Sequence, residues 1–367
     1  MSRILVTIVT GFLGSGKTTL LNSLLTHSDM PQAAVIVNEF GEIGLDYDLI
    51  ERSDESVVQL ENGCLCCSVK SDLIDTFRDL HMLRQSGEVP KFDRVLVETT
   101  GIADPGPVLQ IILTDPMVST CYALDGVVTL IDVINGEETL DNFNESVHQA
   151  AVADRIILTK TDLLGGNERE NRLTRINNRL QKLNPGATIY QSQERKLSPS
   201  DVFGNGLLDA DAIKKDIDSW QQVDTDTPDI DGGHSEHPDH SDHSDHSEHP
   251  EHTHDPLINT FCLVRDQAIS IDTLRLFLEA LTREAGPDLL RVKGIVSVAE
   301  RPETPAVIQG AQQIFHSLKW LADWPSDDRR TRIIFITRGM DKGYIEDSFD
   351  LIERVAARTV AGFSQAV

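Results

Sequence analysis

Apolar and polar positions alternate in blocks along about the first half of the chain. Short, continuous apolar runs are typical of strands in a parallel sheet that is covered on both faces. The longer stretches between them have the spacing of amphipathic helices. This alternation predicts an α/β fold with a doubly wound, mostly parallel sheet. The expected strands are Arg3–Thr10, Ala33–Asn38, Val57–Leu60, Arg94–Glu98, Gly126–Asp132, Arg155–Thr159 and Ala187–Ser192, and the expected helices are Thr18–Thr26, Ser71–Gln85, Glu137–Ala151 and Glu168–Leu183.

The segment His234–His254, a tract rich in histidine and aspartate, interrupts this pattern of strands and helices. Its side chains are polar apart from proline, so it has no apolar surface whose burial could offset the entropy of ordering. We therefore predict three parts: a P-loop domain at residues 1–222, a disordered metal-binding linker at 223–256, and a smaller α+β domain with an antiparallel sheet at 257–367. In the last part we expect strands Asn259–Val264, Leu290–Ala299, Ala306–Leu318 and Arg332–Thr337, and helices Ile271–Arg283 and Gly343–Arg358.

Charge and composition limit the classes of molecule that the protein is expected to bind. The 367 residues carry a formal net charge of −26, which disfavours binding to nucleic acid. No apolar stretch reaches the roughly 18 residues of a membrane span, and the first residues lead into a predicted strand rather than a cleavage site. We expect a cytoplasmic protein that binds neither nucleic acid nor membrane.

The sequence Gly11-Phe-Leu-Gly14-Ser15-Gly16-Lys17-Thr18 fits the phosphate-loop pattern G-x-x-x-x-G-K-[ST]. It lies between a predicted strand and a predicted helix, which is the context that the pattern requires. Backbone N–H groups of such a loop surround phosphate oxygens, and the helix N-terminus adds a positive potential. Lys17 is expected to reach the β- and γ-phosphates, and the Thr18 hydroxyl to hold Mg²⁺.

Two further segments, Glu98–Gly101 and Thr159–Asp162, lie at the ends of predicted strands. We expect them at the same edge of the sheet as the phosphate loop. Glu98 and Asp132 each end a strand, where a carboxylate can hold Mg²⁺ or its water, and the N–H of Gly101 can reach the γ-phosphate. Asp162 can accept two hydrogen bonds from guanine, an arrangement that adenine cannot offer. The aliphatic part of Lys160 can cover the base plane. We therefore predict GTP as the nucleotide.

Three of the five cysteines lie within four positions: Cys64, Cys66 and Cys67. Thiolates are preferred ligands of zinc, and three of them leave one tetrahedral position open. Gly63 favours the turn that could bring the adjacent Cys66 and Cys67 together. The alternatives are a redox pair or inert buried cysteines.

These segments together resemble the CobW-like family of P-loop GTPase metallochaperones, and within it the YjiA-type branch. The resemblance covers most of the chain. It rests on the segments Thr10–Thr19 (TGFLGSGKTT), Asn38–Asp46 (NEFGEIGLD), Glu61–Ser68 (ENGCLCCS), Glu98–Pro107 (ETTGIADPGP) and Thr159–Asp162 (TKTD).

The resemblance implies a GTPase domain with weak intrinsic hydrolysis, a smaller C-terminal domain and metal binding at the three cysteines. It places Thr19 in the nucleotide-binding loop, and Glu39 and Glu42 in a mobile switch segment near the metal. In one departure, Thr159 stands where many GTPases carry Asn. The expected cargo is Zn²⁺, with Co²⁺ or Ni²⁺ as alternatives, and the expected partners are a client metalloprotein and a second copy of the chain. No catalytic residue is assigned.

The linker supplies a second group of potential metal ligands. Neutral imidazole binds Zn²⁺, Ni²⁺ and Cu²⁺, and seven of the eight histidines are three residues apart. A solvated spacer without a ligand role is the alternative. A metal-storage or buffering protein with a regulatory nucleotide site, and a GTPase serving cobalt for cobalamin synthesis or a nitrile hydratase, are rival functions. The tract's histidines are His234, His237, His240, His243, His246, His249, His252 and His254.

Overall fold

A seven-stranded sheet forms the first domain of the computed structural model, which describes residues 3–38, 57–59, 69–192, 197–203, 258–311, 314–315 and 318–364. The strand order is β3-β2-β4-β1-β5-β6-β7, and every pair of neighbours is parallel. This confirms the predicted doubly wound α/β fold. The strands are β1 (Ile4–Gly11), β2 (Ala33–Asn38), β3 (Val57–Gln59), β4 (Arg94–Thr99), β5 (Tyr122–Asp132), β6 (Arg155–Thr159) and β7 (Thr188–Gln191).

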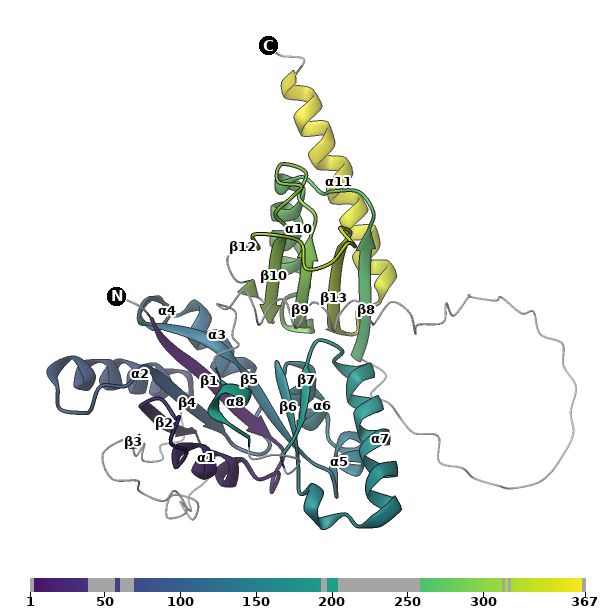
Figure 1. Ribbon diagram of the computed structural model, residues 1–367. Coiled ribbons are helices and arrows are strands. Elements are labelled where there is room, and N and C mark those ends of the chain that lie inside the picture. Colours follow the sequence, from purple (N-terminus) through teal and green to yellow (C-terminus); the bar gives the residue numbers. More distant parts are fainter. Residues whose placement is uncertain are drawn as a thin grey trace, which may run out of the picture.

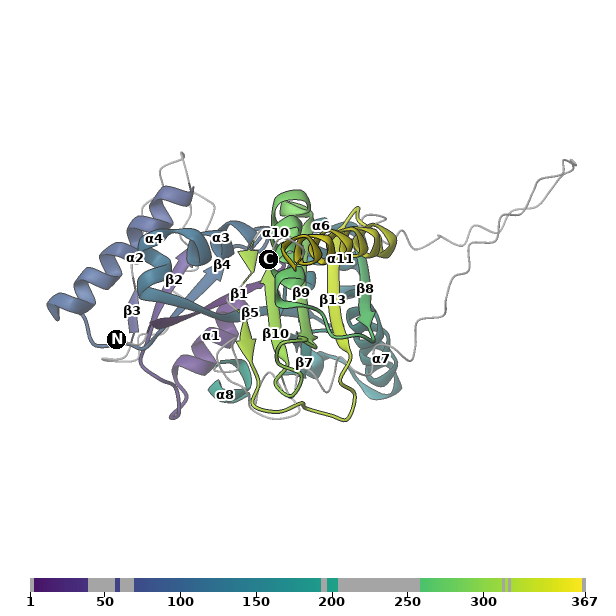
Figure 2. The ribbon, with the colours of Figure 1, turned by 90° about the horizontal axis from the view of Figure 1, so that it is seen from above.

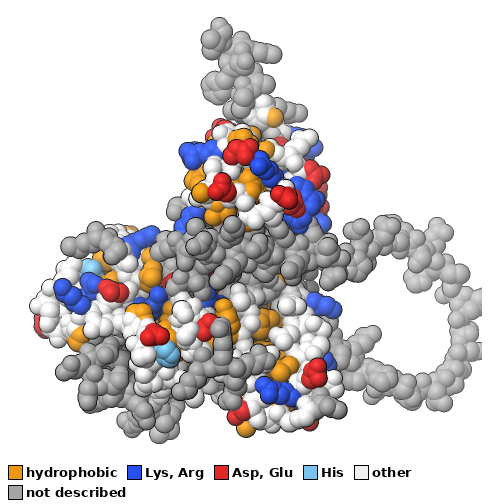
Figure 3. Space-filling model, viewed as in Figure 1, with side chains coloured by type: hydrophobic (Ala, Val, Ile, Leu, Met, Phe, Trp, Pro, Cys, Tyr) orange, Lys and Arg blue, Asp and Glu red, His pale blue; other side chains and the backbone are white. Residues whose placement is uncertain are grey.

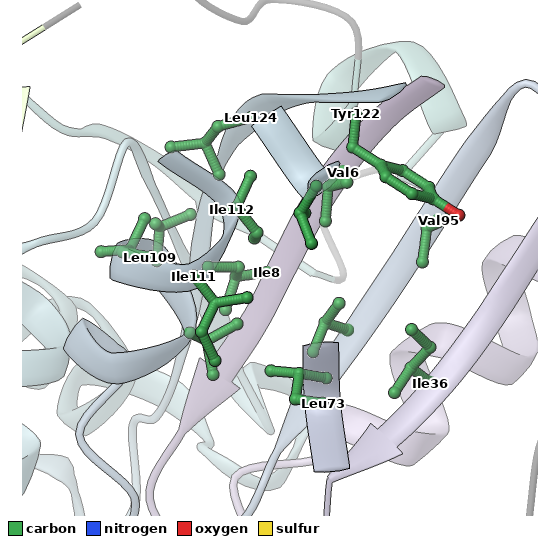
Figure 4. Close-up of a cluster of buried hydrophobic side chains, with 14 of the residues drawn as sticks. Val6, Ile8, Ile36, Leu73, Val95, Leu109, Ile111, Ile112, Tyr122 and Leu124 are labelled. Carbon is green, nitrogen blue, oxygen red and sulfur yellow. The ribbon is translucent and has the colours of Figure 1, made fainter. Parts of the chain in front are cut away.

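Helices cover both faces of this sheet (Figure 1). Side chains of α2 and α3 pack on one face against alternate residues of β1, β2 and β4 (Figure 4), while α1 and α8 pack on the other. Continuous apolar strands are required here because both faces of each strand are buried. The helices are α1 (Lys17–Leu25), α2 (Val69–Ser86), α3 (Gly106–Thr114), α4 (Pro116–Cys121), α5 (Gly136–Asn142), α6 (Asn144–Ala151), α7 (Gly166–Leu183) and α8 (Pro199–Val202).

The predicted helix Glu137–Ala151 is two helices, α5 and α6. They are separated at Phe143, whose backbone is extended (φ −133°, ψ 109°). The Phe143 ring lies 4.6 Å from that of Phe12 in the phosphate loop. A tertiary aromatic contact therefore accompanies the break, and it is invisible in the helical periodicity. The sequence also did not predict α3, α4 and α8.

The second domain is an antiparallel sheet of order β11-β10-β9-β13-β8, with β12 paired to β10. Two helices lie on one face of this sheet (Figure 2), which confirms the predicted α+β domain. The predicted strand Ala306–Leu318 was wrong in length, because the chain turns back on itself to form β10, β11 and β12. The elements are β8 (Ile258–Arg265), α10 (Ile271–Glu284), β9 (Leu289–Val296), β10 (Ala306–Ala311), β11 (Ile314–Phe315), β12 (Lys319–Trp320), β13 (Thr331–Arg338) and α11 (Lys342–Ser364).

The two domains share one hydrophobic core. Leu290 and Ile336 of the antiparallel sheet belong to the same buried cluster as Tyr122 and Ala151 of the parallel sheet. Thr260 at the start of β8 adds a hydrogen bond from its hydroxyl to the carbonyl of Leu183 (2.7 Å). The C-terminal domain is thus packed directly against the first domain.

A charged cluster lies at the same interface. Asp154 forms ion pairs with Arg291 and with Lys293, whose ammonium is 3.1 Å from Oδ1. Both cations are 2% exposed, and Lys293 also donates to the carbonyl of Gly186 (2.9 Å). Burial alone would raise the pKa of Asp154, but Arg291, Lys293 and the N–H of Val127 lower it to about 2. The carboxylate is therefore ionised at neutral pH and balances part of a buried positive charge.

Asp154 immediately precedes β6, whereas Thr159 ends that strand. The C-terminal domain consequently packs at the amino ends of β5 and β6, away from the phosphate loop. Among the described helices, none has the length and apolar character needed to cross a bilayer.

Candidate functional site

The phosphate loop connects β1 to α1 at the carboxyl edge of the parallel sheet. Gly11, Gly14 and Gly16 all have positive φ, at 140°, 69° and 93°. A Cβ on Gly11 would lie 2.4 Å from the carbonyl oxygen of Leu130, so a side chain cannot be accommodated there. The Lys17 ammonium donates to the carbonyl of Gly11 (2.8 Å) and approaches that of Phe12 (3.3 Å). The lysine ammonium is thus held by carbonyls of the loop itself.

Thr18 and Glu98 meet beside this loop. The Thr18 hydroxyl donates to Glu98 Oε1 at 2.9 Å. Parallel pairing of β1 with β4 aligns Val9 with Glu98, which brings the end of β4 to the start of the loop. Glu98 is 6% exposed. A hydroxyl and a carboxylate oxygen at this separation fit the oxygen ligands that Mg²⁺ prefers.

Gly101 lies directly against the phosphate loop. A Cβ at this position would be 2.6 Å from the backbone nitrogen of Leu13 and 2.7 Å from its Cα. Close backbone approach, rather than positive φ, therefore requires glycine here. The amide of Gln149, which is 1% exposed, donates to the carbonyls of Gly101 (3.2 Å) and Ala103 (3.0 Å). Sequence reasoning missed Gln149, because no spacing rule connects α6 with the segment after β4.

The base-recognition candidates lie at the end of β6. Asp162 is exposed on a 3₁₀ turn, Thr161–Leu163. Lys160 immediately precedes this turn and is the only non-glycine residue of the described chain with positive φ (59°). Such a backbone costs on the order of 1–3 kcal/mol and persists where the surroundings hold it. Its ammonium is 2.8 Å from Asp132 Oδ2.

Asp132 was expected as a possible magnesium ligand, and its contacts give it another role. Its Oδ2 accepts from Lys160 and from the Asn135 amide (3.0 Å), and its Oδ1 accepts from the N–H of Ile134 (2.7 Å). The carboxylate that reaches Thr18 is Glu98. Asp132 instead positions Lys160.

Thr159 connects β6 to the phosphate loop. Its hydroxyl donates to the carbonyl of Ser15 at 2.7 Å, and both residues are buried. The loop that carries Lys160 and Asp162 is thereby fixed relative to the phosphate loop. Ser15 itself lies in the loop with its side chain turned inward, whereas Thr19 is exposed in the first turn of α1.

The expected zinc ligands lie outside the described residues. These are Glu39, Glu42, Cys64, Cys66, Cys67, His234, His237, His240, His243, His246, His249, His252 and His254. Within the described residues, no group of three His, Cys, Asp or Glu side chains is placed to hold a metal ion.

Two family matches account for both domains. Residues 5–191 match the CobW/HypB/UreG nucleotide-binding domain, and residues 258–352 match the cobalamin synthesis protein cobW C-terminal domain. The chain belongs to the CobW family. Together with its phosphate loop, this membership makes it a P-loop GTPase.

Curated members of the CobW family resemble the chain over nearly its whole length. The zinc chaperone YjiA of Escherichia coli (strain K12) is 30% identical over 92% of this chain and 94% of that protein. The zinc chaperone CobW of Pseudomonas aeruginosa is 30% identical over 94% of this chain and 90% of its own length. The crystal structure of Zn(II)-bound YjiA GTPase from E. coli superimposes with a TM-score of 0.64 at 26% identity, covering 96% of this chain and 99% of that one.

Proposed function

We propose that the protein is a metallochaperone that uses GTP to control zinc binding and delivers the metal to a client metalloprotein. Zinc would bind the thiolates of Cys64, Cys66 and Cys67, with Glu39 or Glu42 as a further ligand. The names of the relatives, zinc chaperones in two bacteria, support zinc over cobalt or nickel as the cargo.

One structural observation supports coupling between nucleotide and metal. Strands β2 and β3 are adjacent and parallel, and β2 pairs with β4 so that Val37 lies opposite Glu98 and Asn38 opposite Thr99. The segment with Glu39 and Glu42 follows Asn38 directly, and the cysteines follow β3. The described ends of β2 and β3, after which both candidate ligand segments follow in sequence, therefore lie at the edge that carries Thr18 and Glu98. We infer that a change at the γ-phosphate is transmitted to these segments through the ends of the two strands.

The described residues have separable roles in GTP hydrolysis. The backbone of Gly11–Thr18 would hold the phosphates, and Lys17 would exchange its loop carbonyls for phosphate oxygens. Mg²⁺ held by Thr18 and Glu98 would neutralise phosphate charge. The N–H of Gly101 would donate to the γ-phosphate, with Gln149 fixing that segment. Intrinsic turnover is expected to be slow, because none of the motif residues is a candidate for activating the attacking water.

Guanine selectivity is proposed to depend on Asp162. Its carboxylate would accept hydrogen bonds from the ring N–H and the exocyclic amine of guanine. Asp162→Asn would lose this acceptor pair, so the affinity for GTP should fall and the preference should shift toward xanthosine triphosphate. Competition binding of GTP, ATP and xanthosine triphosphate measures this. Equal affinity of the wild-type protein for ATP and GTP would show that Asp162 does not select the base.

Zinc coupling is tested by competition titration in protein lacking residues 234–254. Zn²⁺, Co²⁺ and Ni²⁺ affinities are measured with a non-hydrolysable GTP analogue, with GDP and without nucleotide. A chaperone needs a coupling of about 5–150-fold, and because coupling is reciprocal, metal must change GTP affinity by the same factor. Equal zinc affinities in the three states would contradict the proposal and favour a buffering protein.

Two cysteine variants make the site assignment specific. Cys66→Ala should abolish stoichiometric high-affinity zinc binding and leave nucleotide binding through Lys17 and Thr18 intact. Cys262→Ser is the matched control, since Cys262 is a partly buried thiol on β8 of the C-terminal domain. Loss of zinc binding in both variants would point to a general effect of thiol removal.

A further inference from the structure

Two helices of the first domain, α3 and α6, lie against the C-terminal domain. Helix α3 contacts β11, and Ala311 at the end of β10 belongs to the same buried cluster as the apolar side chains of α3. Helix α6 contacts β9, and its last residue, Ala151, shares that cluster with Leu290. The segment 100–105, which carries Gly101, leads directly into α3. The C-terminal domain therefore packs on the helix that follows this segment and also on α6.

Gln149, in the last turn of α6, connects that helix to the segment 100–105. Its side chain is buried, and its amide nitrogen donates to the carbonyls of Gly101 (3.2 Å) and Ala103 (3.0 Å). Because one amide holds two backbone carbonyls, a displacement of the end of α6 either displaces the segment or breaks these hydrogen bonds. The position of α6 thus determines the position of Gly101.

The connection from Gln149 to the domain interface is short. Five positions separate it from Asp154, which forms the ion pairs with Arg291 and Lys293 of the C-terminal domain. The side-chain amide of Asn184, at the end of α7, donates to three backbone carbonyls in this connection. They belong to Ala150 (2.9 Å), Ala151 (3.0 Å) and Ala153 (2.9 Å). The connection is therefore held as one unit, and a shift of the C-terminal domain at Asp154 is transmitted to Gln149.

The surface charges of the C-terminal domain are of mixed sign in the view of Figure 3. Interspersed charges largely cancel at a distance, and exposed charges more than about 10 Å apart are screened by salt. We therefore expect this domain to act on the nucleotide site through its packed interface rather than through a long-range field.

We propose that Gln149 is a positioning residue for GTP hydrolysis, and that the packing of the C-terminal domain on α6 and α3 sets its position. The inference rests on the proposed contact of the Gly101 N–H with the γ-phosphate. A displacement of the C-terminal domain moves Gln149 and withdraws that N–H, and a misplacement of about 1 Å is enough to slow turnover. Because coupling between two sites is reciprocal, a bound γ-phosphate must in turn change how the C-terminal domain packs.

A Gln149→Met variant tests the positioning role, since methionine has a similar length but cannot donate to the two carbonyls. Single-turnover GTP hydrolysis should fall by roughly 10–100-fold. The affinity for GDP should stay at the wild-type value, because GDP has no γ-phosphate for Gly101 to contact. His148→Ala, at the neighbouring position of the same helix, is the control and should leave both quantities unchanged. A parallel loss of GDP affinity, or normal turnover in Gln149→Met, would overturn the proposal.

A matched pair of leucine variants tests the role of the C-terminal domain. Leu290→Ala removes a side chain at the domain interface, whereas Leu274→Ala removes one from the separate core of the C-terminal domain. Leu290→Ala should lower turnover by roughly 2–30-fold, the range found for residues that carry coupling, and Leu274→Ala should not. In the Gln149→Met background, Leu290→Ala should cause no further loss. Equal losses in both backgrounds would show that the interface does not act through Gln149.

The milder interface variant Ile336→Val, which removes one methylene group, replaces Leu290→Ala if that protein does not fold. Hydrogen exchange of the wild type provides an independent measurement. The amides of β9 should exchange at different rates with a non-hydrolysable GTP analogue and with GDP, and Gln149→Met should abolish the difference. Identical exchange of β9 in the two states of the wild type would overturn the coupling.

The Gly101→Ala variant separates this inference from the proposed function. Normal hydrolysis in Gly101→Ala would show that the proposed contact with the γ-phosphate is wrong. Impaired hydrolysis in Gly101→Ala together with normal hydrolysis in Gln149→Met would leave that contact in place and overturn only the role of Gln149.

Discussion

The ammonium of Lys160 lies 2.8 Å from Oδ2 of Asp132, across two neighbouring strands. The register of β5 with β6 aligns Asp132 with Thr159, the residue before Lys160. This pairing holds Lys160 in a left-handed backbone conformation and directs the turn that carries Asp162. Asp132, which the sequence suggested as a possible magnesium ligand, thus positions the proposed base-recognition loop.

Asp132→Asn is expected to weaken GTP binding while leaving the fold intact. The amide can still accept hydrogen bonds, but the charge that holds Lys160 is lost. A charge-assisted hydrogen bond contributes roughly 1.5–3 kcal/mol, so affinity should fall by about tenfold or more. Equilibrium binding of a fluorescent GTP analogue measures this. Asp141→Asn removes another ion pair, to Arg179 (2.7 Å), and should leave the affinity unchanged.

Gly101→Ala is expected to impair hydrolysis more than binding. The added Cβ would collide with backbone atoms of Leu13, which cannot rotate away, so the phosphate loop and the segment after β4 must separate. Misplacement of this kind can reduce turnover on the order of 100-fold. Single-turnover GTP hydrolysis is the measurement. Gly165→Ala, where the added Cβ meets no atom within 4 Å, is the control. Normal turnover in Gly101→Ala would show that the close approach is dispensable.

Asp154→Asn is expected to destabilise the protein by about 3–5 kcal/mol, because it leaves Arg291 and Lys293 buried without a counter-charge. Denaturant unfolding measures the loss. Glu303→Gln removes an exposed ion pair with Arg329 and should cost less than about 1 kcal/mol. If both variants unfold like the wild type, the buried cluster does not stabilise the interface.

The same aspartate predicts a dependence of stability on pH. Its pKa is lowered from 3.8 to about 2 in the folded protein. The ionised carboxylate therefore stabilises the folded protein. This contribution to the free energy of unfolding is complete above pH 3.8, the pKa in the unfolded chain, and is lost as the pH falls toward 2. It amounts to roughly 2 kcal/mol. The difference in unfolding free energy between the wild type and Asp154→Asn should therefore narrow below about pH 4 and stay constant above it. A constant difference down to pH 2.5 would contradict the shift.

Deletion of residues 234–254 is expected to lower the number of metal ions bound per chain and to leave GTP hydrolysis nearly unchanged. Imidazoles bind metal in the neutral form, so metal bound by the tract should be released as the pH drops through about 6.5. The deletion should remove these pH-sensitive metal ions. Metal stoichiometry by equilibrium dialysis at two pH values measures this. A large loss of thermal stability in the metal-free deletion variant would show instead that the tract supports the fold.

Most of the fold could be predicted from local pattern. Strands β2 and β6 have the predicted limits, because a buried parallel strand needs an unbroken apolar run and ends where polar residues resume. The phosphate loop was equally predictable, since its glycines are required by backbone geometry. The order of strands in the sheet, and the pairing of β2 with β4, were not encoded in any local pattern.

The chain by itself therefore determined the kind of fold and the nucleotide chemistry, which depend on residues close together in sequence at Gly11–Thr18 and Thr159–Asp162. Only the tertiary structure decided which carboxylate reaches Thr18 and which pairs with Lys160. It also decided that Gln149 fixes Gly101 and that Asp154 joins the domains. These contacts connect residues up to 139 positions apart, as in the pairing of Asp154 with Arg291 and Lys293. Their energies depend on burial and on distances set by packing, and neither can be read from spacing along a chain.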